Sequence, residues 1–219
     1  MKLLIACETS GIVRDAFLAK GHDAWSCDIL PSDTPTNRHI QDDVRNVLQM
    51  ENWDQLIVCH PPCTRLCNSG VRWLHTPPPG KTHDQMWQEL DAGAELFSTL
   101  WNADVPHIAI ENPVMHKHAK QRIQNYTHFT QSIQPWQFAN HESSSDNVKK
   151  RTCLWLKELP PLKPTGKLDG SSARDECHKT PPSKLRWKIR SKFYHGIAHA
   201  MANQWGQCDT QTQQLNLFI

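Results

Sequence analysis

The sequence predicts an α/β fold with a mostly parallel sheet, and three observations lead to this prediction. Short apolar runs alternate along the chain with segments whose apolar residues recur at helical spacing. Short polar clusters follow the apolar runs, as loops follow the strands of a parallel sheet. The nine tryptophans and a net charge of only +2 exclude a disordered chain, and no apolar run approaches the roughly 18 residues of a membrane helix.

Each apolar run is expected to be a strand, and each segment of helical periodicity a helix. The expected strands are Lys2–Cys7, Asp23–Leu30, Gln55–Cys59, His107–Ile110 and Thr152–Leu156. The expected helices are Ile12–Lys20, Asp84–Asn102, Met115–Asn125 and Gly196–Trp205. The helix over Asp84–Asn102 is the best defined, because its apolar residues recur at steps of three and four along one face. The expected loops are Pro31–His39, Thr64–His83 and Gly166–Ser183, with an acidic turn at Asp42–Val44.

Length and cysteine usage narrow the class of protein. A chain of 219 residues predicts a single domain over 1–219, with a small polar insertion around 160–190. Its eight cysteines stand at irregular positions, which favours reduced thiols and a cytoplasmic location. The apolar run Leu3–Cys7 is shorter than the core of a signal peptide, about 7–15 residues. We expect no membrane contact.

Five polar segments are expected to converge on one edge of the sheet. Ligands of parallel sheets bind beyond the carboxyl ends of the strands. The segments that follow or end the expected strands are Glu8–Gly11, Asp28, Asp43, Pro61–Cys63 and Glu111–Pro113. We therefore expect the functional site at this edge.

Cys63 is the candidate nucleophile. It follows a buried strand, and the two prolines before it stiffen the turn. A free thiol titrates near pH 8.5, so lowering the pKa of Cys63 by about 1.5 units would take about 2 kcal/mol. A helix N-terminus or a nearby arginine could supply that stabilisation. The alternative is a buried structural cysteine.

Glu111 is the candidate acid beside this thiol. It ends a neighbouring strand, so it should face the same crevice, where partial burial raises the pKa of a carboxyl group and lets it donate a proton. A thiol beside a proton-donating carboxyl suits conjugate addition to an electron-poor ring. The alternative is a carboxylate that caps a helix.

Two motifs resemble those of one enzyme family. Pro61-Pro62-Cys63 resembles the catalytic proline–cysteine motif of the S-adenosylmethionine-dependent DNA cytosine C5-methyltransferases, and Glu111-Asn112-Pro113 resembles their glutamate–asparagine motif, 48 residues after Cys63. The segments 132–164 and 190–202 are similar to small bacteriophage and prophage proteins described as such enzymes. The resemblance spans most of the chain. It implies a Rossmann-like, doubly wound sheet of the class I methyltransferase type.

The resemblance also implies a mechanism. Cys63 would attack carbon 6 of a cytosine flipped out of DNA, and Glu111 would hold the N3 side of the ring. Carbon 5 would then take the methyl group, while Arg151 would contact the target base. The proline-rich loop Thr76–Gly80 would act as a lid, or else be an ordinary surface loop.

The cofactor residues implied by the resemblance begin at the first expected strand. Glu8, Thr9, Ser10 and Gly11 would form the first cofactor loop, although its glycine-rich pattern is reduced to Gly11. The acid for the ribose would be Asp28, which lies 17 residues after Gly11, and the adenine would lie near Asp43; Pro61 would complete the set. Asp28 and Asp43 could instead be solvated turn residues.

A basic segment near the end of the chain is the expected track for nucleic-acid phosphates. Its cations alternate with other residues and would share one face of an extended strand: Lys184, Arg186, Lys188, Arg190 and Lys192. Lys149 and Lys150 are expected to contribute to the same interface. The alternative is a strand edge that charge protects from pairing.

Other interpretations stay open at this point. Cys59, Cys63 and Cys67 could bind zinc or an iron–sulfur cluster, but they lack a C-x-x-C pair, so we expect no metal. The 39 residues from Thr152 to Arg190 are too few for a large recognition domain. This shortage favours weak sequence specificity, a partner protein that supplies targeting, or RNA or a free nucleotide as substrate. The transferred group could also be another sulfonium-borne group, and a catalytically idle binding protein is a further alternative.

Overall fold

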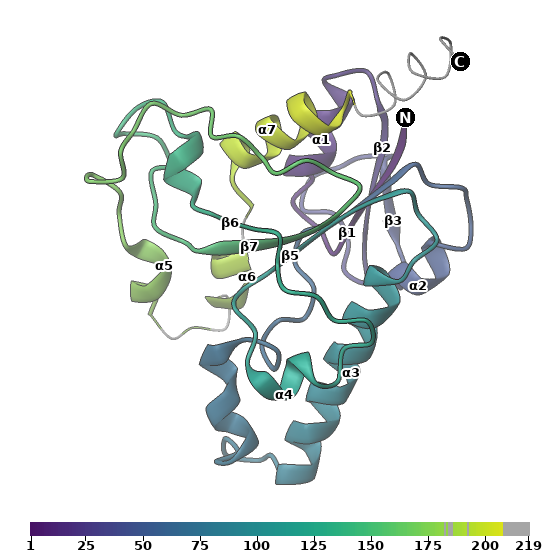
Figure 1. Ribbon diagram of the computed structural model, residues 1–219, viewed down its shortest axis with the longest axis vertical. Helices are drawn as coiled ribbons and strands as arrows, with labels where there is room; N and C mark the ends of the chain where they lie inside the picture. Colours follow the sequence, from purple (N-terminus) through teal and green to yellow (C-terminus); the bar gives the residue numbers. More distant parts are fainter. Residues whose placement is uncertain (182, 184–185, 192, 208–219) are drawn as a thin grey trace.

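A computed structural model describes residues 1–181, 183, 186–191 and 193–207. The core is a seven-stranded sheet of order β3-β2-β1-β4-β5-β7-β6 (Figure 1). The strands are β1 (Lys2–Ala6), β2 (Asp23–Asp28), β3 (His39–Gln41), β4 (Gln55–Val58), β5 (His107–Asn112), β6 (Gln131–Ile133) and β7 (Thr152–Lys157). β1 to β5 pair in parallel, and β7 runs antiparallel to both β5 and β6. The expected α/β fold with a Rossmann-like, mostly parallel sheet is confirmed.

Helices cover both faces of the sheet, so successive side chains of the central strands are buried on opposite sides. On one face, α1 (Ile12–Leu18) and α7 (His195–Trp205) pack together over Leu3 and Ile5 of β1. On the other, α2 (Val44–Val47) and α3 (His83–Trp101) cover Leu4 and Ala6. No helix of the described residues is long and apolar enough to cross a membrane.

The longest helix, α3, follows directly from its sequence. Thr82 caps its first turn in a capping box with Gln85, and the expected apolar face is buried. Phe97 from this face meets Trp155 of β7 edge-on, with ring centroids 5.4 Å apart. The helix expected over Asp84–Asn102 is therefore confirmed to within one residue at each end.

The short elements were not expected. The structure adds β3, α2, the 3-10 helix η1 (Asn68–Leu74) and α5 (Glu176–Lys179) at or next to predicted loops or turns, and β6 and the 3-10 helix η2 (Pro135–Phe138) where no element was predicted. The helix predicted over Met115–Asn125 is reduced to α4 (Lys117–Lys120). It ends early because the following residues bond to the end of α3: the N–H of Gln124 donates to Ser98 Oγ at 2.9 Å.

The prediction of an extended basic segment was wrong. Arg186–Ser191 forms the helix α6, while Lys184 and Lys192 lie outside the described residues. Arginine and lysine are good helix formers, and alternation alone does not select a strand when no neighbouring strand is there to pair with it. In the helix Arg186 and Arg190, four residues apart, share a face.

Candidate active site

Cys63 and Glu111 reach one edge of the sheet because β4 and β5 are parallel neighbours. Val58 of β4 pairs with Ile110 of β5, so Glu111 stands level with Cys59, four residues before Cys63. The carboxyl group of Glu111 is close enough to Cys63 to raise the pKa of that thiol. The structure therefore brings the expected nucleophile and the expected acid together.

Hydrogen bonds join the loop after β4 to the segment after β5. The N–H of Asn68 donates to the carbonyl of Val114 at 3.0 Å, and the N–H of His116 donates to the carbonyl of Leu66 at 3.1 Å. The ring of His116 also lies 2.6 Å from the carbonyl of Arg65 through Nε2. These bonds hold the turn that carries Cys63 against the strand that carries Glu111.

Cys67 forms a thiol pair with Cys63 that we did not predict. The N–H of Cys67 donates to the carbonyl of Cys63 at 3.0 Å, a turn that puts the two side chains on the same side of the loop. The hydrogen bond between the two thiols, followed by burial and the charge of Glu111, raises the pKa of Cys63. The same hydrogen bond lowers the pKa of Cys67, assisted by Ser69, whose Oγ lies 3.1 Å from Cys67 Sγ.

This finding differs from the expectation of a lowered pKa for Cys63. Within the pair, the pKa of Cys63 is raised and the pKa of Cys67 is lowered. The signal in the sequence is the spacing of four residues between these cysteines, which we had related only to metal binding. Among the described residues, no three histidine, cysteine or acidic side chains form a group that could hold a metal ion.

Glu111 is a proton donor near neutral pH. Its side chain is buried, and this desolvation raises the pKa of Glu111 to about 7, against the opposing charge of Lys150. The expected rise in the pKa of Glu111 is therefore present.

The cation beside this acid is Lys150, which we had expected on the phosphate-binding surface. Its charge lowers the pKa of both Glu111 and Cys63, and its Nζ lies 5.5 Å from the ring centroid of Tyr194. The pairing of Leu154 with Glu111 puts residues 150, 152 and 154 on the side of the sheet that carries Glu111. The sequence lacks this information, because the register is set only when the sheet forms.

The neighbouring cations point elsewhere. Arg151, expected at the target base, is exposed, and its Nε donates to Ser132 Oγ at 3.1 Å. Lys149 is exposed and its backbone N–H donates to the carbonyl of Arg174 at 2.8 Å. Neither is linked to Cys63 or Glu111 by a contact among the described residues.

The expected cofactor acids lie near the carboxyl end of β1. The charges of Asp28 and Asp43 both raise the pKa of Cys7, so the two carboxylates flank that strand end. Asp28 accepts the N–H of Leu30 at 2.9 Å through one oxygen, and burial raises its pKa. Asp43 binds the Arg45 guanidinium through both oxygens, at 2.5 and 3.0 Å, and this pair lowers the pKa of Asp43.

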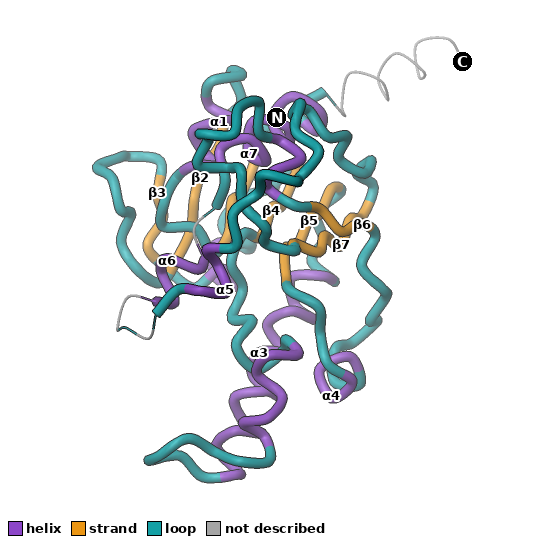
Figure 2. The backbone as a smooth tube through the Cα atoms, turned by 90° about the vertical axis from the view of Figure 1, so that its left-hand side faces the viewer, coloured by secondary structure: helices purple, strands orange, loops and turns teal. Residues whose placement is uncertain are grey.

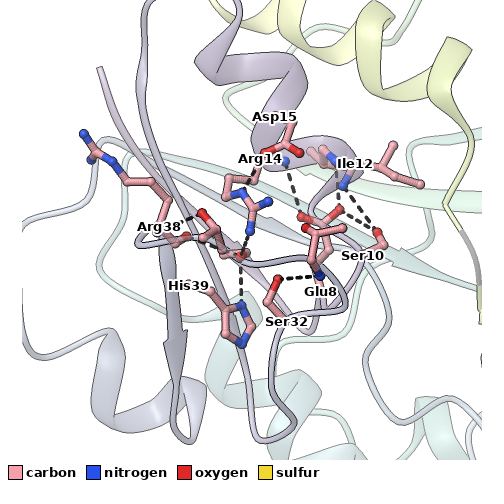
Figure 3. Close-up of polar contacts among 12 residues, drawn as sticks. Glu8, Ser10, Ile12, Arg14, Asp15, Ser32, Arg38 and His39 are labelled. Carbon is pink, nitrogen blue, oxygen red and sulfur yellow. Dashed lines mark hydrogen bonds and ion pairs between the residues drawn. The ribbon is translucent and has the colours of Figure 1, made fainter.

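The turn after β1 is built around Glu8, which is fully buried (Figure 3). Its carboxylate accepts the N–H groups of Val13 at 2.8 Å and Arg14 at 3.3 Å, at the start of α1. Ser10 donates to Glu8 through its hydroxyl at 3.2 Å, and the hydroxyl of Thr9 lies 3.2 Å from Asp33. Glu8 therefore holds the turn in place through these hydrogen bonds, and it has no exposed surface that a ligand could contact.

Gly11 closes this turn over a buried arginine. Arg14 is 2% exposed, and its Nη1 donates to Ser26 Oγ at 2.9 Å (Figure 3). Gly11 has φ of 73°, and a Cβ at this position would lie 2.1 Å from Arg14 Nη2. Only glycine fits this turn without displacing the guanidinium. A charged residue in a short amphipathic helix is normally expected at the surface, so the sequence gives no signal for the role of Arg14.

A cavity of about 380 Å³ lies beside the loop that carries Cys63. It is lined by α2, α3 and this loop, through Arg45, Pro62, Thr64, Arg65, Glu89, Ala92, Gly93, Glu95 and Leu96. Pro62 directly precedes Cys63, and Arg45 is the partner of Asp43. Pro61, which we expected to bind the cofactor, is buried, and it directly precedes Pro62 of the cavity lining.

Comparisons with known proteins add little to this geometry. No protein-family model and no curated protein sequence matches the chain. One similar solved structure is that of an E. coli protein, provisionally described as a DNA modification methyltransferase encoded within a prophage. It is 13% identical with a TM-score of 0.41, over 71% of this chain and 46% of that one. The chain thus spans less than half the length of that protein, and a likeness of this size says nothing about activity.

The turn at Gly11 makes a prediction about stability. Gly11→Ala should lower the free energy of unfolding by about 1–3 kcal/mol, because it combines a positive φ with a clash against Arg14. Gly21→Ala is the matched control, since Gly21 has φ of 82° but nothing within 4 Å of an added Cβ. Urea denaturation measures both variants. Equal losses for the two would contradict the packing of Arg14 under the turn.

The raised pKa of Glu111 predicts how the free energy of unfolding depends on pH. The folded protein holds this proton more tightly than the unfolded chain, so its stabilising effect is complete below about pH 4.5 and is lost as pH rises through about 7. Glu111→Gln should remove up to about 3 kcal/mol of this pH dependence between pH 4.5 and 7. Urea denaturation across this range tests it, with the exposed Glu142→Gln as control. An unchanged slope in Glu111→Gln would show that this carboxyl group is not buried.

Proposed function

We propose that the chain transfers a methyl group from S-adenosylmethionine to carbon 5 of cytosine in DNA, through a covalent Cys63 adduct. The observation that carries this proposal is the meeting of Cys63 with a Glu111 that holds a proton near pH 7. A nucleophile and an acid on one strand edge match the two groups that addition to a cytosine ring needs. The resemblance of the two motifs to the cytosine C5-methyltransferases supports the same reaction.

The proton on Cys63 has an acceptor within the site. As Cys63 Sγ bonds to carbon 6 of the ring, its proton moves to the thiolate of Cys67. Glu111 donates its proton to N3, so the electron pair of the broken 5,6 double bond forms a 4,5 double bond, which makes carbon 5 nucleophilic. A bound cofactor would supply the electrophilic methyl group that carbon 5 takes up. The proton of carbon 5 then passes to solvent as the 5,6 double bond re-forms and the thiolate of Cys63 leaves. N3 returns its proton to the Glu111 carboxylate, and Cys67 returns its proton to Cys63.

Lys150 balances the charges that this sequence creates. Once Glu111 has given up its proton, its carboxylate lies in a buried site where a charge without a partner is costly. The ammonium of Lys150 already favours the ionised form of Glu111 and of Cys63. Arg151 remains our candidate for the target base, which it would reach by leaving Ser132.

The residues at the carboxyl end of β1 fit the cofactor. The carboxylate of Asp28, partly buried at this edge, suits the hydroxyl groups of a ribose. Asp43, Pro61 and the adjoining cavity would hold the ring system, and the half-buried residues Thr9 and Ser10, with the backbone of Gly11, would hold the amino-acid part. Glu8 would act indirectly, by fixing that turn at the start of α1.

Two arginines of α6 fit the phosphates of the DNA backbone. The Nε atoms of Arg186 and Arg190 are buried without a hydrogen-bond partner among the described residues. Both side chains are only half-buried, so a phosphate would bind at their exposed part. Lys149 and the other cations of the basic segment, Lys184, Lys188 and Lys192, would extend the same interface.

A catalytically idle binding protein is the second candidate, because the raised pKa of Cys63 disfavours the thiolate form that a nucleophile needs. RNA or a free nucleotide could also replace DNA as substrate. Mass spectrometry of nucleosides separates these cases, after incubation of DNA, RNA and nucleotide pools with the protein and methyl-labelled S-adenosylmethionine. Labelled 5-methylcytosine in DNA is expected. Label in RNA or nucleotides alone would change the substrate, and no label in any pool would favour the idle protein.

Removing the nucleophile should abolish turnover while the fold persists. Cys63→Ala is expected to lower the rate by at least about a thousandfold, because the proposed bond to carbon 6 is formed by Cys63 Sγ. Cys153→Ala is the matched control and should keep turnover, because Cys153 lies on the face of β7 opposite to the face that carries Glu111. The same labelled-nucleoside assay measures both, and circular dichroism checks the fold. Unchanged turnover of Cys63→Ala would rule out the covalent mechanism.

The thiol pair should give a thiolate below the usual range of cysteine. Thiolate absorbance near 240 nm, followed during a pH titration, should show one group that ionises well below about pH 8.5. Cys67→Ser should remove that step, whereas Cys153→Ser should leave it in place. A titration of wild-type protein with no low step would contradict the pairing of Cys63 with Cys67.

A further inference from the structure

A lobe extends from the sheet beyond the strand ends that carry the candidate site. It consists of residues 60–91 and 113–128, which include η1, the first half of α3, and α4. Figures 1 and 2 show these helices below the carboxyl ends of β4 and β5, away from α1 and α7. We call this part of the molecule the distal lobe.

The two loop-rich segments of the distal lobe contain cations and no acids. Residues 60–83 and 113–128 include six arginines and lysines but no aspartate or glutamate: Arg65, Arg72, Lys81, Lys117, Lys120 and Arg122. Acids of α3 pair with three of them, since Glu89 binds Arg65 and Lys81, and Asp91 binds Arg122. The other three cations, Arg72, Lys117 and Lys120, have no acidic partner among the residues that the structure describes. The lobe therefore presents a surplus of positive charge.

Aromatic rings lie among these cations. Trp87 of α3 meets His118 of α4 edge-on with centroids 5.2 Å apart, and His75 lies 6.2 Å from Trp87 and 6.0 Å from His118. Burial and the neighbouring charges lower the pKa of His118, which favours its neutral ring. His75 is exposed, and Trp87 and His118 are half-buried. Arg122 lies over one face of Trp87, 4.9 Å from the ring centroid, so a base would stack on the cluster from its solvent-exposed side, which carries His75.

The distal lobe is joined directly to the candidate site. The bonds of His116 to Leu66 and Arg65 tie the start of α4 to the loop of Cys63. The chain enters the lobe at residue 60, three residues before Cys63, and again at residue 113, two residues after Glu111. A strand whose base lies between those two side chains would have its neighbouring nucleotides near the lobe.

We propose that the distal lobe binds a polynucleotide strand beside the target nucleotide, with one base on the His75–Trp87–His118 cluster and phosphates on Lys117 and Lys120. This inference rests on the proposed function only in taking nucleic acid as the partner. Cations that meet phosphates and rings that stack on bases are the two elements of single-strand binding. A lobe of this kind would supply the contacts for which the segment between β7 and α7 is too short.

Binding of a labelled oligonucleotide to catalytically inactive Cys63→Ala protein tests the inference without any need for turnover. Fluorescence anisotropy is measured over a range of salt concentrations, with single-stranded and duplex DNA. Lys117→Glu with Lys120→Glu should weaken binding and reduce the slope of log K against log salt by about 1.4 for single strands or about 1.8 for duplex. The matched control is Lys20→Glu with Lys163→Glu, two exposed lysines outside the lobe, which should leave the slope unchanged.

The aromatic cluster is tested separately. Trp87→Leu should weaken binding of single strands about 5- to 100-fold without changing the salt slope, and Trp87→Phe should restore most of the affinity. The inference is overturned if the variants with substitutions in the lobe bind the oligonucleotide like the control variant. It is also overturned if the protein with an unaltered lobe binds no oligonucleotide. Lobe-dependent binding without cytosine methylation would overturn the proposed function and leave this inference standing.

Discussion

The parallel pairing of β4 with β5 is the constraint on which the site depends. It fixes the carboxyl ends of the two strands side by side, so that a thiol after one strand and a carboxyl group at the end of the other share a buried edge. The loop of Cys63 is then held against the segment after Glu111 by backbone bonds of Asn68 and His116. Neither side chain needs a direct bond to the other, because the backbone sets their separation.

Burial at this edge determines the protonation states. It raises the pKa of Glu111 to about 7, which makes the carboxyl group a donor at the pH where the protein would work. Burial also raises the pKa of Cys63. The hydrogen bond between the two thiols raises the pKa of Cys63 further and lowers the pKa of Cys67. The charge of Lys150 opposes the rise in pKa at both Glu111 and Cys63. The candidate site therefore brings together Cys63, Cys67 and Glu111, whose pKa values are all shifted, with the charge of Lys150 beside them.

The fold was predictable from the sequence, and the site only in part. The periodicity of α3 and the apolar runs of β1, β2, β4 and β5 are strong local signals, so their positions followed directly. Four-residue helices and three-residue strands carry too little pattern, and they form here because neighbouring elements hold them. The helix α6 shows the limit most clearly, because its alternating cations are compatible with a strand until the surrounding structure excludes one.

The sequence analysis missed residues whose contacts depend on strand register, on burial or on the conformation of a turn. Lys150 reaches Glu111 because β7 pairs antiparallel with β5, and nothing local distinguishes it from Lys149 or Arg151. Arg14 is buried under a glycine turn, whereas its place in the sequence suggests a surface charge. Cys67 was visible as a spacing of four residues, but its pairing with Cys63 depends on the turn between them.

The central claim is that Cys63 and Glu111 act on one pyrimidine ring, and trapping the adduct tests it most directly. With 5-fluorocytosine in the oligonucleotide, carbon 5 has no proton to lose after methyl transfer, so elimination of the thiol is blocked. Intact mass spectrometry should show a methylated oligonucleotide bound to Cys63, with far less in Glu111→Gln and none in Cys63→Ala. Labelled 5-methylcytosine made by wild-type protein, with no adduct at Cys63, would contradict the account.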